Sequence, residues 1–544
     1  MRKWSHMQAI ARYIILATGW QRRLLAFASG AIGALALAPF ELFPAFLVPM
    51  TVAVWLIDGS QASAGSSADG AGHSLASLKA AAEAGWWLGF GYFVAGLWWI
   101  GAAFLVEAEQ FAWAMPLGVV ALPAVLACST AIGFGLARLF WSSGSERILA
   151  LAISLSVTEW LRGHAFGGFP WNDFGMVLGS NLYLGQFGSV IGLYGLTLLA
   201  IAIFAAPATL AEGVRLANAP VLLAGAALAG LALFGVIRLS GGDAGTVKNV
   251  RLRIMQPNVQ HDLKFFTGSR DALLDRYLSV SDSATSPKST GLADVTHLIW
   301  PESPFPFHLA REPKMLARIG AALPSGTLLI TGAARLGAIV SGQTRPPVFN
   351  SLLVVGKGGT ILDTYDKIHL VPFGEYIPFH TVLEAIGLRQ FTLSSFEAGV
   401  TRKLMAIPGL PPLSPLICFE AIFSGQVLPE DITAHDERPG VILNVTDDSW
   451  FGQTPGPYQH LAQVRLRAIE EGIPVLRAAD SGISAIVDPY GRIVAQLRLG
   501  TEGVLDGGLP NAIAATQFSR HRSLSWLTIW LIALILNGAL RFRI

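Results

Sequence analysis

Long apolar runs occupy two parts of the chain and leave a polar block between them. Residues 24–240 are mostly apolar, and a further apolar run follows at Ser525–Leu540. In residues 249–510 charged residues return, and short β-branched runs alternate with helical patterns. A helix that crosses a bilayer needs about 20 apolar residues. The two apolar parts therefore predict membrane helices, and the block between them predicts an extramembrane domain.

The apolar parts predict eight membrane-spanning helices, seven before the polar block and one after it. The second and the fifth runs are short for a full span. The predicted helices are Leu24–Ala38, Phe43–Ile57, Trp86–Val106, Trp113–Phe140, Ile148–Leu161, Phe187–Ala206, Pro220–Leu239 and Ser525–Leu540.

Basic residues between the predicted helices indicate the orientation. If residues 1–22 are cytoplasmic, the short outer loops keep only Arg162 and the edge residue Arg238. This bias follows the positive-inside rule. It predicts a cytoplasmic segment 1–22, a transmembrane domain 23–240, a domain outside the membrane at 249–510, and a last span with a cytoplasmic tail at 524–544. The basic residues on the inner side are then Arg2, Lys3, Arg12, Arg22, Arg23, Lys79, Arg138, Arg147, Arg215, Arg541 and Arg543.

The polar block predicts sheets that are covered by helices, because β-like and helical patterns alternate along it. Gln463–Glu471 predicts a helix with Arg465, Arg467, Glu470 and Glu471 on wet faces. The candidate strands are Val250–Met255, His297–Trp300, Gly326–Thr331, Asn350–Val355, Leu416–Cys418, Val441–Asn444, Pro474–Arg477 and Ser484–Val487, and the run Thr360–Asp366 is also β-like.

Composition supports a membrane protein. The chain has 544 residues, of which 52% are hydrophobic and 14% charged, against roughly 25% charged in an average soluble domain. The formal net charge of +2 gives no electrostatic case for binding nucleic acid. Two cysteines cannot form a disulfide framework. Cys128 lies in an apolar stretch, whereas Cys418 stands between a β-like run and a carboxylate.

Three residues that follow β-like runs carry candidate chemistry: Glu302, Lys367 and Cys418. A thiol is mostly protonated at neutral pH, so a nucleophilic cysteine needs a base, and a carboxylate can take its proton. A nearby lysine favours the thiolate and stabilises the oxyanion that forms when sulfur attacks a carbonyl. The pattern therefore favours acyl chemistry through a cysteine nucleophile.

Each of the three residues also has a simpler interpretation. A lone cysteine is more often a small buried hydrophobe than a nucleophile. Glu302 can be a turn carboxylate after Pro301, and Lys367 can pair with Asp366 on the surface. A second catalytic scheme is a Cys–His dyad. Its candidate bases are His308, His369 and His460.

Longer motifs around these residues resemble the nitrilase superfamily, whose members use a Glu–Lys–Cys triad. The matching segments are Trp300–Glu302, Tyr365–Pro378, Ile417–Glu420, Asp448–Gly452 and Gly456–His460. This resemblance implies an α-β-β-α sandwich for residues 249–510. It assigns Cys418 as the nucleophile, Glu302 as the proton acceptor and Lys367 as the group that stabilises the oxyanion and the thiolate.

Segments in the apolar part narrow the resemblance. Glu159–Gly163 followed by Gly168–Trp171, together with Leu37–Phe40, is similar to the apolipoprotein N-acyltransferase family. We also expect Glu159 and Arg162 to pair at i,i+3 on a helix. Three positions depart from the family pattern: Phe419 replaces a Tyr, Lys264-Phe265 replaces a Trp, and Thr446-Asp-Asp448 replaces Ser-Asn-Asp.

That family resemblance implies an enzyme of the bacterial inner membrane with its catalytic domain in the periplasm and both termini in the cytoplasm. It would move an acyl chain from the sn-1 position of a phospholipid to the N-terminal amine of a diacylglyceryl-modified apolipoprotein. The transfer would be ping-pong, through a thioester on Cys418, with no metal or cofactor. We expect a monomer.

The resemblance also implies supporting residues. Glu375 and Glu420 would position Lys367 and tune proton transfer, or would form structural salt bridges. Asn350, Tyr376, Trp450 and Phe451 are the candidates for substrate contacts, and the loop near Phe391–Phe396 is a candidate apolar wall or lid. Ordinary packing is the alternative for each aromatic side chain.

Two other functions fit parts of the pattern. A membrane-anchored nitrilase-type amidase would hydrolyse small amides, but eight spans are far more than an anchor needs. A transporter would place paired or repeated charges inside its spans. The predicted spans of this chain are nearly free of charge.

Overall fold

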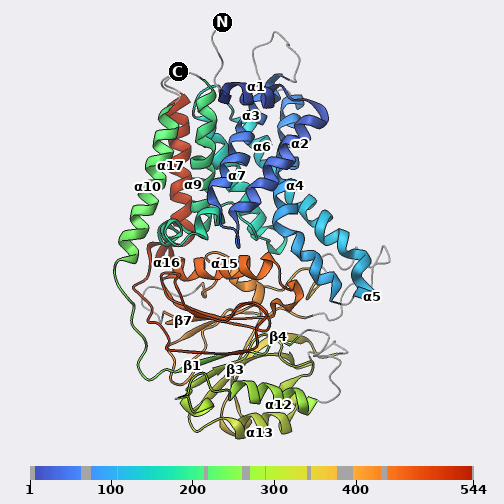
Figure 1. The fold of residues 1–544 in the computed structure, drawn as a ribbon, viewed down its shortest axis with the longest axis vertical. Helices are drawn as coiled ribbons and strands as arrows, with labels where there is room; N and C mark the ends of the chain where they lie inside the picture. Colours follow the sequence, from blue (N-terminus) through green and yellow to red (C-terminus); the bar gives the residue numbers. More distant parts are fainter. Residues whose placement is uncertain are drawn as a thin grey trace. The chain divides into compact units, whose positions relative to one another are not determined.

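The computed structural model describes residues 6–62, 75–106, 108–212, 218–259, 270–287, 289–339, 345–376, 396–430 and 438–541. The chain divides into two compact units. The helical unit is Met1–Gly242 with Thr516–Ile544, and the sheet unit is Asp243–Ala515. Figure 1 shows the long helices of the first and the strands of the second.

Helices of the helical unit follow the predicted apolar runs. Within the described ranges, six stretches are long and apolar enough to cross a membrane, and they include six of the eight predicted spans. The other two runs fall on α2, which has 15 residues, and on α7, which carries three charged residues. The helices are α1 (His6–Leu16), α2 (Gly19–Gly33), α3 (Leu47–Ala62), α4 (Leu75–Leu97), α5 (Ala108–Phe111), α6 (Leu122–Leu139), α7 (Arg147–His164), α8 (Met176–Gly179), α9 (Gly188–Ala205), α10 (Ala219–Leu239), α16 (Gln517–His521) and α17 (Ser523–Arg541).

Glycine lets the inner helices approach closely. A Cβ on Gly30 of α2 would lie 1.9 Å from the carbonyl oxygen of Leu88 in α4, and one on Gly89 would lie 1.8 Å from Oγ1 of Thr130 in α6. Both separations are far below van der Waals contact, so only glycine fits there. Small residues at helix contacts are typical of helix packing in lipid.

Two sheets form the sheet unit. One has six strands in the order β11-β1-β2-β3-β4-β5, and the other has five in the order β10-β9-β8-β7-β6. Parallel pairs join β1, β2 and β3 in the first sheet and β6, β7 and β8 in the second. The strands are β1 (Leu252–Gln256), β2 (His297–Ile299), β3 (Leu328–Leu336), β4 (Val348–Val355), β5 (Ile361–Asp366), β6 (Leu413–Ile417), β7 (Val441–Thr446), β8 (Val475–Ala479), β9 (Ala485–Val487), β10 (Ile493–Gln496) and β11 (Gly503–Gly507).

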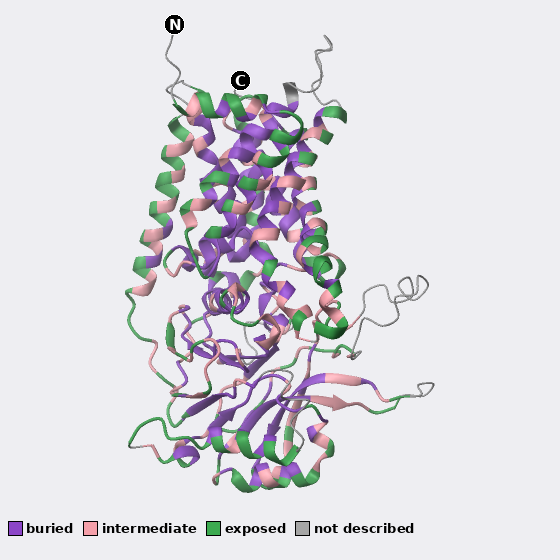
Figure 2. Cartoon of the chain, turned by 45° about the vertical axis from the view of Figure 1, so that its right-hand side comes forward, coloured by how far each residue is buried: buried purple, intermediate pink, exposed green. Residues whose placement is uncertain are grey.

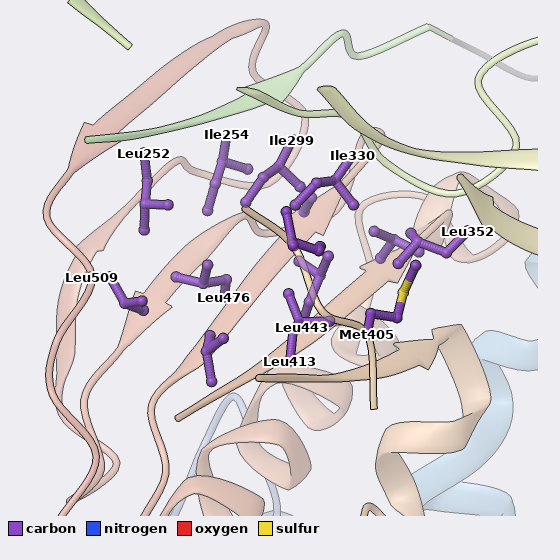
Figure 3. Packing of buried hydrophobic residues seen from close by; sticks show 14 of the residues in the cluster. Leu252, Ile254, Ile299, Ile330, Leu352, Met405, Leu413, Leu443, Leu476 and Leu509 are labelled. Atoms are coloured by element: carbon purple, nitrogen blue, oxygen red, sulfur yellow. The ribbon is translucent and has the colours of Figure 1, made fainter. Parts of the chain in front are cut away.

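A single apolar core lies between the two sheets. Ile254 and Ile330 from the first sheet pack with Leu443 and Leu476 from the second (Figure 3). The outer face of the first sheet packs against α12 (Arg270–Ser281) and α13 (Pro313–Ala322), and the outer face of the second packs against α15 (Pro455–Glu471). The strands are largely buried, while α12 and α13 expose their outer faces (Figure 2). The sheet unit is therefore the expected α-β-β-α sandwich.

Three sequence expectations need correction. Cys418 was expected to end a strand, but it is the first residue of a 3₁₀ turn, Cys418–Ile422. The short strands β10 and β11 were not predicted. Arg467, Glu470 and Glu471 of α15 were expected on wet faces but are buried. An ion pair of 3.2 Å between Arg467 and Glu470 helps to compensate for that burial.

Candidate active site

Cys418 begins a tight turn directly after β6 with an unusual backbone. Its φ of +51° lies in the left-handed region, which costs a residue with a Cβ about 1 kcal/mol or more. The Glu420 carboxylate holds this turn by accepting a hydrogen bond of 2.8 Å from the backbone N–H of Ile417. Cys418 itself is half-buried. Such a sharp turn presents the thiol at the end of a stiff strand.

Glu302 lies just after β2 and is buried. Its carboxylate accepts hydrogen bonds from Nδ2 of Asn350 at 2.7 Å and from the backbone N–H of Asp447 at 2.9 Å. Gly332 of β3 makes room for it, because a Cβ there would lie 2.7 Å from the Cα of Glu302. The carboxylate is thus fixed by partners from both sheets.

Lys367 follows β5, and its ammonium lies between two carboxylates. Nζ is 3.5 Å from Glu302 Oε1 and 2.9 Å from the carboxylate of Glu375. The side-chain amide of Asn350 donates to both acids, at 2.7 Å to Glu302 and 2.8 Å to Glu375. The backbone N–H of Val371 donates to the other oxygen of Glu375 at 2.8 Å. The structure therefore gathers one ammonium and two carboxylates around one amide.

Burial and mutual charge set the proton affinities of this group. Burial raises the pKa of Glu302, and the charge of Glu375 raises it further, while Lys367 and Asn350 oppose the rise. Burial alone would lower the pKa of Lys367, but Glu375 and Glu302 outweigh it and the pKa is raised. Lys367 is therefore charged, and Glu302 is a stronger base than an exposed glutamate.

The charges around Cys418 favour a neutral thiol at rest. Burial raises the pKa of the thiol well above its ordinary value, and Glu302 and Asp448 raise it further. Lys367 and a hydrogen bond from Thr446 act in the opposite direction. The thiolate must therefore form with the help of a base, and Glu302 is the carboxylate that acts most strongly on it.

Glu420 is fully buried and holds backbone on both sides of the site. It accepts from the backbone N–H of Ile417, directly before the cysteine, and from that of Ile368, directly after the lysine, at 2.8 and 3.0 Å. Arg402 and the hydroxyl of Tyr365 bind the same carboxylate at 3.0 and 2.8 Å. Burial opposes its charge, yet Arg402 and these hydrogen bonds lower its pKa. Glu420 therefore fixes the spacing of the lysine and cysteine loops.

The three histidines occupy different places. His308 Nδ1 lies 3.3 Å from the carbonyl oxygen of Ala334, and His369 stacks on Phe423 with ring centroids 4.4 Å apart. His460 Nε2 lies 3.2 Å from the carbonyl oxygen of Cys418. His460 thus contacts the backbone carbonyl of Cys418. A carbonyl oxygen carries no proton, so this contact is not one between a base and a thiol.

The four candidate substrate contacts differ in exposure. Trp450, Phe451 and Tyr376 are half-buried, whereas Asn350 is buried between the two carboxylates. Asn350 is thereby placed to position acids. The segments 377–395 and 260–269 lie outside the described residues, and with them most of the Phe391–Phe396 loop and the Lys264-Phe265 pair. Phe419, at the expected Tyr position, is buried and packs edge-to-face on Phe423 at 5.1 Å.

The matched motif of the helical unit forms a buried ion pair. Arg162 Nη2 lies 2.5 Å from Glu159 Oε2 on α7, which confirms the i,i+3 pair. Arg162 also donates to the backbone carbonyls of Phe169 and Trp171, the latter at 3.0 Å. One arginine therefore holds the Gly168–Trp171 segment against α7.

The sequence analysis missed one role and one group of residues at the site. The bridging role of Asn350 was missed, although its place at the start of a strand was predicted. Thr446, Asp448 and Arg477 form a buried polar group near Cys418, and the sequence analysis named Thr446 and Asp448 only in its comparison with the family pattern. Within the described ranges, we find no group of three or more His, Cys, Asp or Glu that could hold a metal ion.

Comparison with known proteins places both units. The carbon-nitrogen hydrolase family model matches residues 308–518, and the model of the apolipoprotein N-acyltransferase N-terminal domain matches residues 29–206. The chain is 50% identical over 519 residues to the apolipoprotein N-acyltransferase of Rhodopseudomonas palustris, with 94% of each chain covered. It is 47% identical over 525 residues to that of Bradyrhizobium diazoefficiens, with 96% of this chain and 95% of the relative covered.

Among solved structures, an amidase from Nesterenkonia sp. AN1 aligns with 53% of this chain and 99% of its own, at 18% identity and a TM-score of 0.34. The relatives at 50% and 47% identity, which match the chain over nearly its whole length, show the family on their own. The chain belongs to the apolipoprotein N-acyltransferase family, a family of membrane enzymes with a carbon-nitrogen hydrolase domain.

Proposed function

We propose that this protein transfers an acyl chain from the sn-1 position of a phospholipid to the N-terminal α-amine of a diacylglyceryl-modified apolipoprotein, through a thioester on Cys418. The family names support the overall reaction. The observation that carries the mechanism is the placement of Lys367 between Glu302 and Glu375, with the charges of Glu302 and Lys367 both acting on the Cys418 thiol.

In the first stage Glu302 takes the proton of the Cys418 thiol, and the sulfur attacks the ester carbonyl of the phospholipid. Lys367 and nearby backbone N–H groups stabilise the negative charge on the carbonyl oxygen. The carbon–oxygen bond of the ester breaks, and Glu302 returns the proton to the departing lysophospholipid alcohol. An acyl thioester remains on Cys418.

In the second stage the neutral α-amine of the apolipoprotein attacks the thioester. Glu302 takes a proton from the amine, the carbon–sulfur bond breaks, and the proton goes to the Cys418 thiolate. The amide is released and the thiol is restored. Division into two acyl transfers is the advantage of a nucleophilic catalyst.

Both substrates carry long tails, which would be costly to expose to water at about 0.8 kcal/mol per CH₂. We therefore propose that the catalytic domain, 249–510, lies in the periplasm at the surface of the inner membrane. Segment 1–22 and the end of segment 524–544 would then be cytoplasmic. Residues 23–240 would cross the membrane between segment 1–22 and the catalytic domain. The enzyme would act as a monomer.

Intact-mass analysis tests the proposal. We expect purified protein incubated with phospholipid to gain the mass of one acyl chain, and hydroxylamine to remove it. The Cys418→Ala variant should gain no mass, while Cys128→Ala should behave like the parent. A diacylated peptide added to the acyl-enzyme should take up the chain. An adduct that persists in Cys418→Ala, or hydrolysis of small amides without acyl transfer, would reject this function.

A further inference from the structure

Behind Cys418 lies a buried polar group that the proposed mechanism does not use. Thr446 ends β7, and its hydroxyl donates to Asp448 Oδ1 over 3.1 Å. Arg477 Nη2 binds the other oxygen of Asp448 at 2.6 Å. All three side chains are buried, at 1% exposure or less. The hydroxyl of Thr446 therefore has two possible hydrogen-bond acceptors, the carboxylate of Asp448 and the sulfur of Cys418.

Strand register brings Thr446 to the nucleophile. Ile417 of β6 pairs with Val445 of the parallel strand β7, so Cys418, the first residue after β6, lies next to Thr446, the last residue of β7. The backbone of Thr446 is fixed from the other side, because its carbonyl accepts from the N–H of Asp480 at 3.1 Å. The hydroxyl of Thr446 acts on the sulfur as a hydrogen-bond donor that lowers the pKa of the Cys418 thiol, and its O–H bond can rotate.

The hydrogen bonds of His460 indicate where the hydroxyl proton of Thr446 points while the Cys418 thiol is neutral. Its Nε2 faces the carbonyl of Cys418 at 3.2 Å, and because a carbonyl only accepts, Nε2 carries the proton. Burial lowers the pKa of His460, and Arg477 lowers it further, so the ring is neutral and Nδ1 has a lone pair. Arg477 Nη2 is a donor to that lone pair at 3.2 Å. Asp448 Oδ1, at 3.1 Å from Nδ1, then accepts its hydrogen bond from the hydroxyl of Thr446 rather than from the ring.

We propose that Thr446 is a further catalytic residue, whose hydroxyl proton turns from Asp448 to the sulfur of Cys418 whenever that sulfur carries negative charge. This happens twice in the proposed cycle, before attack on the ester and when the carbon–sulfur bond of the thioester breaks. No covalent bond to Thr446 forms or breaks. The inference rests on the proposed function for its place in the cycle.

The competition between the two acceptors explains why the proton turns. A hydroxyl has one proton to donate. While the thiol is neutral, the Asp448 carboxylate is the better acceptor. Once Glu302 has taken the proton and a thiolate forms, the nearby ammonium of Lys367 still pairs with Glu375, whereas Asp448 keeps Arg477. The thiolate is then the charge with fewer partners, and a hydrogen bond to it gains more than one to Asp448.

The test is alkylation of Cys418 by iodoacetamide in the purified full-length chain, measured by mass spectrometry of its peptide across a pH series. A Cys128→Ser background removes the exposed second thiol. We expect Thr446→Val to slow alkylation about tenfold at neutral pH, since a hydrogen bond to a charge is lost. The rate should approach that of the parent at high pH, where the thiol is ionised without help. Thr446→Ser, which keeps the hydroxyl, should stay within about twofold of the parent.

A matched control and a second variant protect the conclusion. Thr327 is also buried and donates to the carbonyl of Val295 at 2.7 Å, so Thr327→Val makes the same change elsewhere in the sheet unit and should leave alkylation unchanged. Should Thr446→Val fail to fold, Thr446→Ala replaces it. Parent-like rates in the apolar variants, or equal losses in Val and Ser, would overturn the proposal. Alkylation needs no lipid, so failure of acyl-enzyme formation in the parent would reject only the proposed function.

Discussion

The ammonium of Lys367 lies closer to Glu375, at 2.9 Å, than to Glu302, at 3.5 Å. The candidate base is therefore not the lysine's main partner. Glu375 holds the lysine, and Glu302 keeps a carboxylate whose proton affinity is raised by burial and by its neighbour. Glu375 and Asn350 shift the pKa of Glu302 in opposite directions, so their replacement should shift the pH dependence of the reaction in opposite directions.

Replacement of Glu375 by glutamine should move the acid limb of acyl-enzyme formation to lower pH. Glu302 works as a base only when ionised, so its raised pKa puts that limb above the ordinary range of glutamate. The charge of Glu375 contributes to the rise, and its removal lowers the pKa of Glu302. Because a weaker base results, the plateau rate should also fall, by about tenfold. The limb is measured by intact mass at a series of pH values.

Glu397→Gln is the matched control, since that carboxylate is exposed in the same stretch of chain. Its profile should coincide with the parent. A limb that stays in place in Glu375→Gln would mean that Glu302 does not titrate in this step.

Replacement of Asn350 by alanine should move the same limb to higher pH. The amide hydrogen bond of 2.7 Å stabilises the ionised form of Glu302 and lowers its pKa. Without it the base is protonated at a higher pH, and acyl-enzyme formation at mildly acidic pH should slow. The same pH series measures the effect. Movement of the limb in one direction for both variants would contradict this account of the cluster.

Loss of charge at Glu420 should act on stability more than on chemistry. Glu420→Gln leaves Arg402, which is largely buried, without its carboxylate, and it weakens the hydrogen bonds to Ile417 and Ile368. Breaking a buried pair costs about 3 kcal/mol. We expect a clearly lower midpoint of thermal unfolding, followed by tryptophan fluorescence.

The neighbouring ion pair serves as the control for that change. Lys403 and Asp363 are 2.8 Å apart but much more exposed, so Lys403→Gln should leave the midpoint nearly unchanged. Equal effects of the two substitutions would show that Glu420 does not organise the turn.

A methyl group at Gly332 should impair activity while preserving the fold. Its Cβ would lie 2.7 Å from the Cα of Glu302 and 2.8 Å from the backbone nitrogen of Ser303, so the base must move. Misplacement of a reacting group by about 1 Å costs on the order of 100-fold in rate. Gly356→Ala is the control, because its Cβ would meet only side-chain atoms, those of Leu362 at 3.3 Å and Leu328 at 3.7 Å. An active Gly332→Ala enzyme would argue against Glu302 as the base.

The sequence predicted the elements better than the contacts between them. Apolar runs marked the helices, and β-branched runs marked the inner strands, because both are buried and pattern follows burial. Strand β10 was not predicted because it has only four residues and is mostly exposed, so its pattern does not follow burial. Arg467 and Glu470 were misplaced on α15 because a charged residue normally indicates solvent, and only the fold shows that the two neutralise each other.

The site shows the same limit. Motif resemblance named Glu302, Lys367 and Cys418, but the left-handed backbone of Cys418 depends on hydrogen bonds to Glu420 that no local pattern encodes. The amide of Asn350 between two acids likewise depends on strand register. The local sequence identifies the chemical groups of the site, but only the tertiary structure shows which groups they contact.

The group of one lysine and two glutamates has an imbalance that extends to the second substrate. With both acids ionised, the cluster holds one surplus negative charge. A free α-amine has an ordinary pKa of about 7.7–8.0 and is largely cationic at neutral pH. Such a cation is attracted to the surplus charge. The same imbalance would thus recruit the protonated amine of the second substrate to the site.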